Sequence, residues 1–183
     1  MAKAKTGSFY LTETITLPAA TADGGRVQGT IDLGAYVNVP TGQALAIESV
    51  DFVYQAGSSY NQQVEAFLSG NGAISVQLSD LNPGTSFVRA DNQSLISSGA
   101  LNIDLANNIG SQHSDLYPDN FGPAALSEAF MVVNDTLYLT AMPSGTSIGT
   151  DNLYVTVRVR CRVVKLAQQD WMAIAIQSTA SDN

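Results

Sequence analysis

The single histidine of the chain, His113, lies within the segment Ser111-Gln112-His113-Ser114-Asp115. Serine, histidine and aspartate are the residue types of a hydrolase site in which the imidazole acts as general base for a hydroxyl nucleophile. Neighbouring positions in a sequence do not by themselves create the geometry of such a site. We therefore interpret His113 as a polar loop residue, and we predict that the chain has no catalytic residue and is not an enzyme.

The chain offers few ligands of the kinds that metals prefer. Cys161 is the one cysteine, and it falls on the apolar face of an alternating segment, which predicts a buried, inert thiol. One histidine and one cysteine make no zinc site without carboxylates. Asp115, Asp119 and Asn120 carry oxygens suited to calcium but lack the spacing of an EF-hand. Such loop residues more often cap turns, so we predict no metal and no cofactor.

Three arginines, Arg158, Arg160 and Arg162, occupy alternate positions near the C-terminus. In a strand they share one face, where they either form a stripe that meets an acidic neighbouring subunit or pair with acids on the adjacent strand. Half of the eight positive charges lie between Arg158 and Lys165, which favours the interface. Trp171 begins an apolar cluster that we interpret first as core and second as a further subunit contact or a patch on a membrane surface.

The segments that would carry these residues alternate between apolar and polar side chains, as half-buried antiparallel strands do. Between Gln43 and Gln55 the alternation changes parity, which predicts a bulge near Ser49 or a strand buried on both faces. About nine or ten short strands with frequent turns predict an all-β sandwich or barrel. We expect a single jelly roll of about eight main strands, with an immunoglobulin-like sandwich as the alternative.

No break in composition divides the chain, so we predict one domain over residues 1–183, with a flexible arm at 1–7 and a loose tail at 177–183. Asn134-Asp135 is expected to close a hairpin between the flanking apolar runs. The long irregular stretch Asn107–Pro123 is expected to be exposed or to lie between subunits. The run Leu166–Ile176 fits either a short helix or one more strand.

The charge of the chain restricts its partners. A net charge of −8 with only three lysines argues against direct binding to nucleic acid, because lysine and arginine must neutralise phosphates. An acidic, lysine-poor surface fits a protein from a salt-loving organism, and equally fits an ordinary acidic protein. The first residues lack the apolar core of a secretory signal, and no apolar run is long enough for a membrane-spanning helix. We therefore expect synthesis in a cytoplasm.

These features together resemble those of a viral coat protein. In size and strand pattern the stretches Ser8–Leu17, Val27–Leu33 and Asn152–Lys165 are similar to the small major capsid proteins of icosahedral haloarchaeal viruses with an internal membrane, of the sphaerolipovirus kind. Those proteins are single jelly rolls that stand upright on the capsid. None of the stretches is a specific motif, so no site residue is carried over from that family.

The resemblance implies a structural role in the virion. The chain would form homo-oligomers and would pair with a second, larger capsid protein to build the icosahedral shell, close to the internal viral membrane. Two other functions are compatible with a β-sandwich. A carbohydrate-binding domain would stack sugar rings on tyrosines such as Tyr36, Tyr60 and Tyr117, and a virion spike domain would form small closed oligomers.

Overall fold

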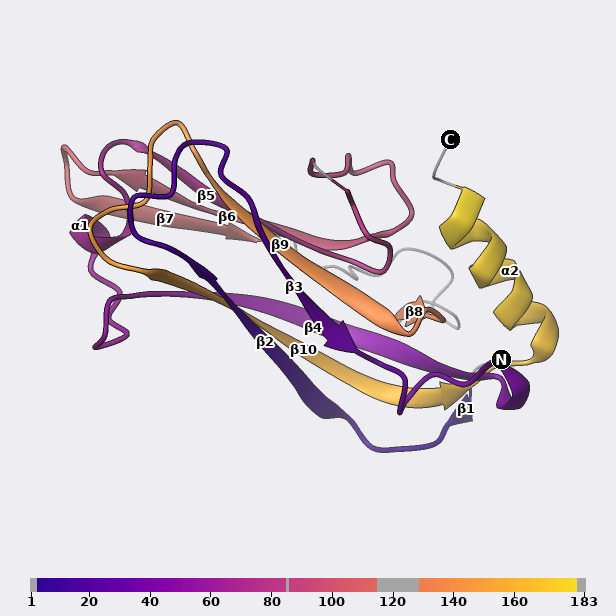
Figure 1. Cartoon of the computed structure of the whole chain (residues 1–183). Coiled ribbons are helices and arrows are strands. Elements are labelled where there is room, and N and C mark those ends of the chain that lie inside the picture. The colour runs from indigo at the N-terminus through magenta and orange to yellow at the C-terminus, as the bar shows by residue number, and fades with distance from the viewer. Residues whose placement is uncertain (1–2, 85, 115–128, 181–183) are drawn as a thin grey trace.

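The structure is a computed structural model that describes residues 3–84, 86–114 and 129–180. Two five-stranded sheets pack face to face (Figure 1). The first sheet contains β1 (Lys3–Ala4), β2 (Phe9–Leu17), β4 (Gln43–Ala56), β8 (Phe130–Val132) and β10 (Leu153–Lys165). The second sheet contains β3 (Val27–Asp32), β5 (Gly72–Ser79), β6 (Leu95–Asp104), β7 (Ile109–Ser114) and β9 (Thr136–Ser144).

The strand pairs are nested, so that the two halves of the chain fold back on each other. β2 pairs with β10, β3 with β9, β4 with β8, and β5 with β6, all antiparallel. Rolling up this long hairpin adds the pairs β10 with β4 and β9 with β5, which gives the two-sheet order of a jelly roll. The predicted single jelly roll with eight main strands is therefore confirmed, and β1 and β7 are the additional strands.

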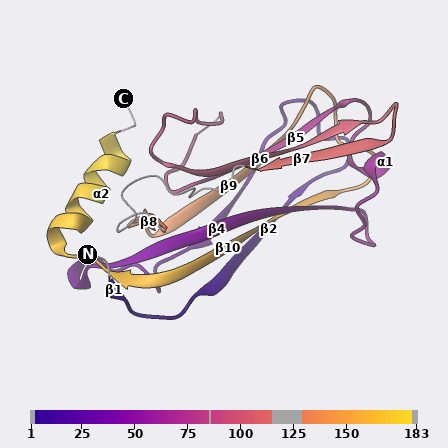
Figure 2. The same ribbon diagram turned by 180° about the vertical axis from the view of Figure 1, so that it is seen from behind.

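The two sheets face each other, as the view from behind also shows (Figure 2). One cluster of buried apolar side chains draws on both sheets. β10 shows how the sequence builds it, since its alternate residues from Leu153 to Val163 point inward and are buried. The intervening residues, among them Arg158 and Arg160, point to solvent. Cys161 lies on the inward face as predicted, is fully buried and is a free thiol. The alternation of apolar and polar residues therefore shows which side chains of β10 face the core and which face solvent.

The change of parity in β4 is a bulge, the first of the two alternatives predicted for it. Arg160 is the partner of Ser49, but Cys161 is the partner of Ile47, so Glu48 is the extra residue on β4. The bulge returns Leu45 and Ile47 to the same inner face as Val50 and Phe52. It also leaves the side chain of Glu48 on the outer face, beside the arginines of β10.

The hairpin predicted at Asn134-Asp135 is wrong. β8 pairs with β4 in the first sheet, whereas β9 pairs with β3 and β5 in the second sheet, so the connection crosses between sheets. The Asn134 side-chain amide donates hydrogen bonds to the backbone carbonyl and the carboxylate of Asp80. The chain bends at residues 134 and 135, but long-range packing sets the partners of the flanking strands.

The chain ends differ from the predicted arm and tail. β1 lies within the predicted arm and pairs with the end of β10, where the Val163 amide also donates to the Thr6 hydroxyl. The ambiguous segment after β10 is a helix, α2 (Gln168–Ala180), which extends into the predicted tail. A second helix, α1 (Val64–Phe67), has only four residues. Neither of these two described helices has the length and hydropathy needed to cross a membrane.

The long irregular stretch predicted from Asn107 to Pro123 is shorter than expected. Its first part forms β7, an edge strand that pairs with β6. Gln112 points inward and donates a 2.9 Å hydrogen bond to the Phe52 carbonyl, so that β7 is tied to the opposite sheet. Residues 115–123 lie outside the described residues.

Candidate functional site

The outward side chains at the centre of the first sheet form the candidate functional surface. They come from the polar face of three neighbouring strands, with β10 in the middle and β2 and β4 on either side. We call the following set the open face: Tyr10, Thr12, Thr14, Asp51, Val53, Thr156 and Arg158. The predicted row of arginines lies on this side of the sheet, as the alternation of β10 requires.

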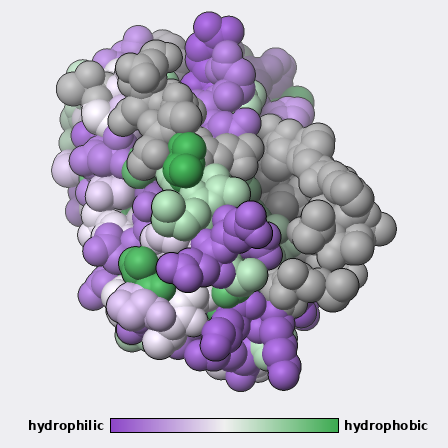
Figure 3. Space-filling model, turned by 90° about the vertical axis from the view of Figure 1, so that its right-hand side faces the viewer, coloured by the Kyte–Doolittle hydropathy of each residue, from purple (hydrophilic) through white to green (hydrophobic). Residues whose placement is uncertain are grey.

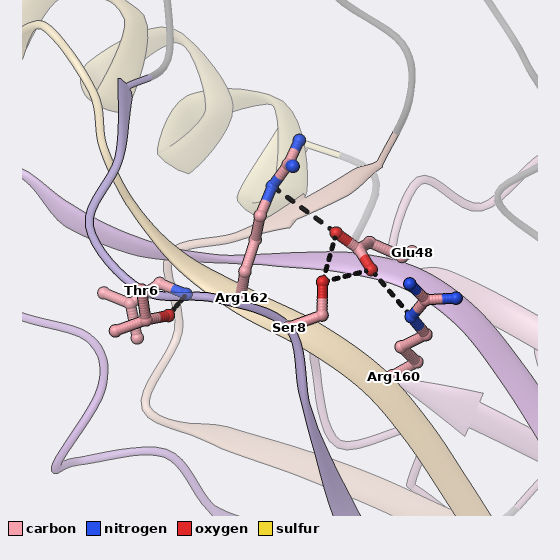
Figure 4. A network of polar contacts seen from close by, with 6 residues as sticks. Thr6, Ser8, Glu48, Arg160 and Arg162 are labelled. Atoms are coloured by element: carbon pink, nitrogen blue, oxygen red, sulfur yellow. Dashed lines mark hydrogen bonds and ion pairs between the residues drawn. The ribbon is translucent and has the colours of Figure 1, made fainter.

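Arg160 and Arg162 are joined to one acid of their own chain (Figure 4). The Nε atom of Arg160 lies 3.0 Å from Oε2 of Glu48, and Nε of Arg162 lies 3.5 Å from Oε1. The Ser8 hydroxyl lies 2.8 and 3.0 Å from the same two oxygens. The Glu48 side chain is only 17% exposed. Of the two interpretations of the arginine row, pairing with an acid on the adjacent strand therefore describes Arg160 and Arg162.

The bulge is what makes this network possible. A regular β4 strand would place an inward-pointing residue at position 48, since neighbouring residues of a strand face opposite sides. The extra residue instead turns the carboxylate outward between two arginines that are two positions apart on β10.

Burial, and after it the charge of Glu48, raise the pKa of the Cys161 thiol to about 12. The thiol is therefore neutral at physiological pH, which fits the inert role predicted for it.

Arg158 is held differently from the other two arginines. Its guanidinium carbon lies 5.3 Å from the centre of the Tyr10 ring, a cation–π contact between two exposed residues. Asp51 is the residue directly opposite Arg158 on β4 and is also exposed. No ion pair joins Arg158 and Asp51 in the part of the chain that the structure describes. The open face thus carries one positive and one negative side chain next to each other.

Trp171 does not lie in a core strand. It belongs to α2 and packs, half-buried, on a second small apolar cluster. That cluster contains Ala44, Ala46 and Val164. These three side chains lie on the same side of the first sheet as Arg162, so α2 covers one end of the outer surface of that sheet. Trp171 Nε1 is buried and has no hydrogen-bond partner among the described residues. Trp171 therefore joins α2 to the sheet within one chain.

The end of the molecule that carries α2 exposes apolar side chains in small patches between hydrophilic ones (Figure 3). Met172 and Ile176 are 53% and 61% exposed and lie one helical turn apart. Single exposed apolar residues are normal on protein surfaces. Met172 and Ile176 therefore do not by themselves mark a binding surface.

Among the residues that the structure describes, the others with potential for chemistry do not come together in one site. The Ser111 hydroxyl and Nε2 of His113 are 3.4 Å apart on the exposed edge strand β7. Asp115, the third member of that predicted group, lies outside the described residues, as do Asp119 and Asn120. The ring of Tyr36 packs at a tilt against Phe9, and that of Tyr60 at a tilt against Tyr154, while Tyr117 lies outside the described residues.

The sequence contains a serine motif that our sequence reasoning overlooked. Gly145-Thr146-Ser147-Ile148-Gly149 has the Gly-x-Ser-x-Gly spacing of a nucleophile elbow. In an elbow the serine stands on a turn from a strand to a helix, whereas this segment joins β9 to β10. The Ser147 hydroxyl is 2.8 Å from the hydroxyl of Ser69. The segment is therefore a turn between two strands.

A shallow groove of about 380 Å³ lies on the outer surface of the second sheet. Its lining includes Ser75, Gln77, Phe87 and His113. The Gln77 side chain holds the loop after β5, because its amide donates to the Val88 carbonyl at 2.9 Å and accepts from the Val88 amide at 3.0 Å. The second sheet is thus partly covered by its own chain.

A buried acid lies at the end of β5, close to that loop. Asp80 is 2% exposed, and burial raises the pKa of its carboxyl to about 7 against the opposing effect of hydrogen bonds from the backbone and Asn134. One carboxylate oxygen, Oδ1, has no hydrogen-bond partner among the described residues. No feature of the sequence around Asp80 distinguishes it from the exposed aspartates.

No model of a protein family matches this sequence, and none of the curated proteins does. Among solved structures, the chain is similar to VP1 of Trichodysplasia spinulosa-associated polyomavirus in complex with GM1 oligosaccharide. The TM-score is 0.41 with 9% identity, over 90% of this chain and 97% of that one. It is also similar to Merkel cell polyomavirus VP1 in complex with GD1a oligosaccharide, with a TM-score of 0.39 and 12% identity, over 89% and 98% of the two chains.

Proposed function

We propose that this chain is a capsid protein, a structural subunit that self-associates and pairs with a second, larger capsid protein in an icosahedral virion shell. The observation that carries the proposal is the open face, where Tyr10 and Arg158 are exposed at the centre of a sheet. Tyrosine and arginine are enriched in protein interfaces, and lysine is depleted. The open face contains no lysine.

The fold is compatible with this role. Jelly rolls are frequent in viral capsids and also occur in lectins and cupins, so the fold alone does not assign the function. The resemblance to the capsid proteins of haloarchaeal viruses adds the expectation of a salt-rich cytoplasm for synthesis and of a position above an internal membrane. In this proposal the role is structural rather than catalytic, and His113 has no part in it.

The proposal is tested by sedimentation velocity of the purified chain over a series of salt and protein concentrations, with negative-stain images of the large species. A capsid subunit should form dimers or larger ordered assemblies under some of these conditions. In parallel, mass spectrometry of particles purified from the source culture should detect this chain at high copy number. Absence of the chain from particles, together with a monomer in all solutions, would contradict the proposal.

A further inference from the structure

The open face has a charge pattern that can complement itself. Arg158 on β10 and Asp51 on β4 are direct partners across the two strands and point to the same side. They are not joined to each other in the described structure, since the Arg158 side chain leans over the Tyr10 ring on the opposite side of β10. Each therefore presents its charge outward.

We infer that the open face is a two-fold interface between copies of this chain, in which Arg158 of each copy pairs with Asp51 of the other. This inference rests on the self-association proposed above. In an isologous contact, if residue i meets residue j, then j also meets i. Consider a two-fold axis that lies in the contact plane, runs parallel to the strands and passes midway between β4 and β10. Rotation about this axis places β4 of the partner over β10 of the first copy, and β10 of the partner over β4. It therefore brings the arginine of one copy over the aspartate of its partner.

The neighbouring residues suit a flat contact between two sheets. Thr156 is flanked on β2 by Thr14, with their hydroxyls 2.8 Å apart, and on β4 by Val53. These short side chains leave the surface low around the taller Arg158 and Tyr10. Sheets pack face to face at a spacing of about 10 Å when their side chains are of this size.

The charge of the remaining surface favours this occupant over an unrelated acidic protein. The open face holds one cation and one anion and is neutral, while the whole chain carries −8. Two copies would repel each other over most of their surfaces. The open face is a place where they meet without net repulsion and with two new ion pairs.

The size of the face indicates a weak dimer. The open face covers five residues along β2, about 17 Å, and three neighbouring strands, about 14 Å. Such a contact belongs to the class that buries less than about 1,200 Å², which is typical of transient association. We therefore expect a dimer that forms at high protein concentration and that a shell would stabilise through many simultaneous contacts.

Reversal of one charge at a time tests the inference, because one variant brings like negative charges together at the contact and the other brings like positive charges together. Arg158→Asp places two aspartates against each other at both contacts, and Asp51→Arg does the same with two arginines. Each variant should dimerise at least about tenfold more weakly than the wild type in sedimentation velocity at low salt. A mixture of the two variants should recover the wild-type affinity, because both contacts of the mixed dimer then join opposite charges.

Arg89→Asp is the matched control, because it makes the same charge change on an exposed loop next to the second sheet. Circular dichroism melts of every variant check that the fold is retained. The inference is overturned if the wild type is monomeric at every concentration, if Arg158→Asp weakens dimers no more than Arg89→Asp, or if mixing fails to restore them. Dimers that are insensitive to both exchanges would leave the capsid proposal standing and reject only this surface.

Discussion

The outer surfaces of the two sheets are built by the same alternation of side chains but are completed in different ways. On the second sheet, Gln77 binds the backbone of Val88 and draws a loop over the strands. On the first sheet, α2 covers only one end, and Tyr10 and Arg158 remain exposed at the centre. The comparison teaches that a loop of the chain itself covers part of one surface, whereas Tyr10 and Arg158 remain exposed at the centre of the other.

The largest expected effect concerns the buried acid of the second sheet. The pKa of Asp80 is about 7 in the folded chain against an ordinary value of 3.8, so the folded state binds the proton more tightly. Stability from this group is therefore present in full below about pH 4 and is lost as the pH rises through 7. Three pKa units correspond to at most about 4 kcal/mol.

Asp80→Asn should therefore raise the free energy of unfolding at pH 8 and leave it nearly unchanged at pH 4. The variant should also show a smaller change in unfolding free energy between these two pH values than the wild type. Urea denaturation at several pH values measures this. Asp51→Asn, on the exposed open face, is the control for removing one carboxylate. An Asp80→Asn variant that is less stable than the wild type at pH 8 would show that the carboxylate is needed in its charged form.

The next effect tests whether Gln77 completes the second surface. Gln77→Ala removes two hydrogen bonds and leaves the Val88 amide and carbonyl without these partners, which should cost about 2 kcal/mol of unfolding free energy. Limited proteolysis should also cut the loop around Val88 faster. The matched control is Gln55→Ala on the first sheet, which removes a single hydrogen bond, to the Tyr60 carbonyl. Equal losses in both variants would contradict the difference between the two surfaces.

A smaller effect is expected for the bulge residue of the first sheet. Glu48→Ala removes the acceptor shared by Ser8, Arg160 and Arg162, and should reduce the unfolding free energy by about 1 kcal/mol because two of its partners are partly exposed. Glu48→Gln keeps the hydrogen-bond acceptor and separates its contribution from that of the charge. Thermal melts at low and high salt measure both variants. A loss that does not change with salt would assign the effect to packing.

The smallest effect on stability belongs to the open face itself. Arg158→Ala should change the unfolding free energy by no more than about 0.5 kcal/mol, because the contact with Tyr10 is exposed. Chemical denaturation measures this value, and Thr12→Ala on the same face serves as the control. A loss above about 2 kcal/mol would mean that Arg158 supports the fold, which would remove the reason to regard it as available for a partner.

The strands and their faces were predictable from the sequence because they depend on local alternation. The inward position of Cys161 follows from parity, whereas parity left two possibilities near Ser49, a bulge or a strand buried on both faces, and the register between β4 and β10 decides for the bulge. The crossing at Asn134-Asp135 was not predictable, since turn residues do not show which sheet a following strand joins. The role of Glu48 was missed for a related reason: a change of parity locates a bulge but does not show which side chain turns outward.

The candidate surface was predicted in part. Alternation placed Arg158, Arg160 and Arg162 on one face, and the structure separates them, because two pair with Glu48 and one does not. Asp51 has no signal in the sequence, since its position opposite Arg158 depends on the register between β4 and β10. In the sequence, Gln77 and Asp80 are not distinguishable from exposed polar residues, because burial by a loop leaves no periodic pattern.

The place of β10 between β2 and β4 has a consequence for the time at which the protein acquires its fold. Phe9 is paired with Cys161, so the first sheet cannot close until β10 has left the ribosome. Contacts between such distant residues make folding slow. Until β10 arrives, β2 and β4 expose their apolar faces, and such species tend to aggregate. The emergence of β10, rather than that of any earlier segment, therefore controls when the first sheet can form.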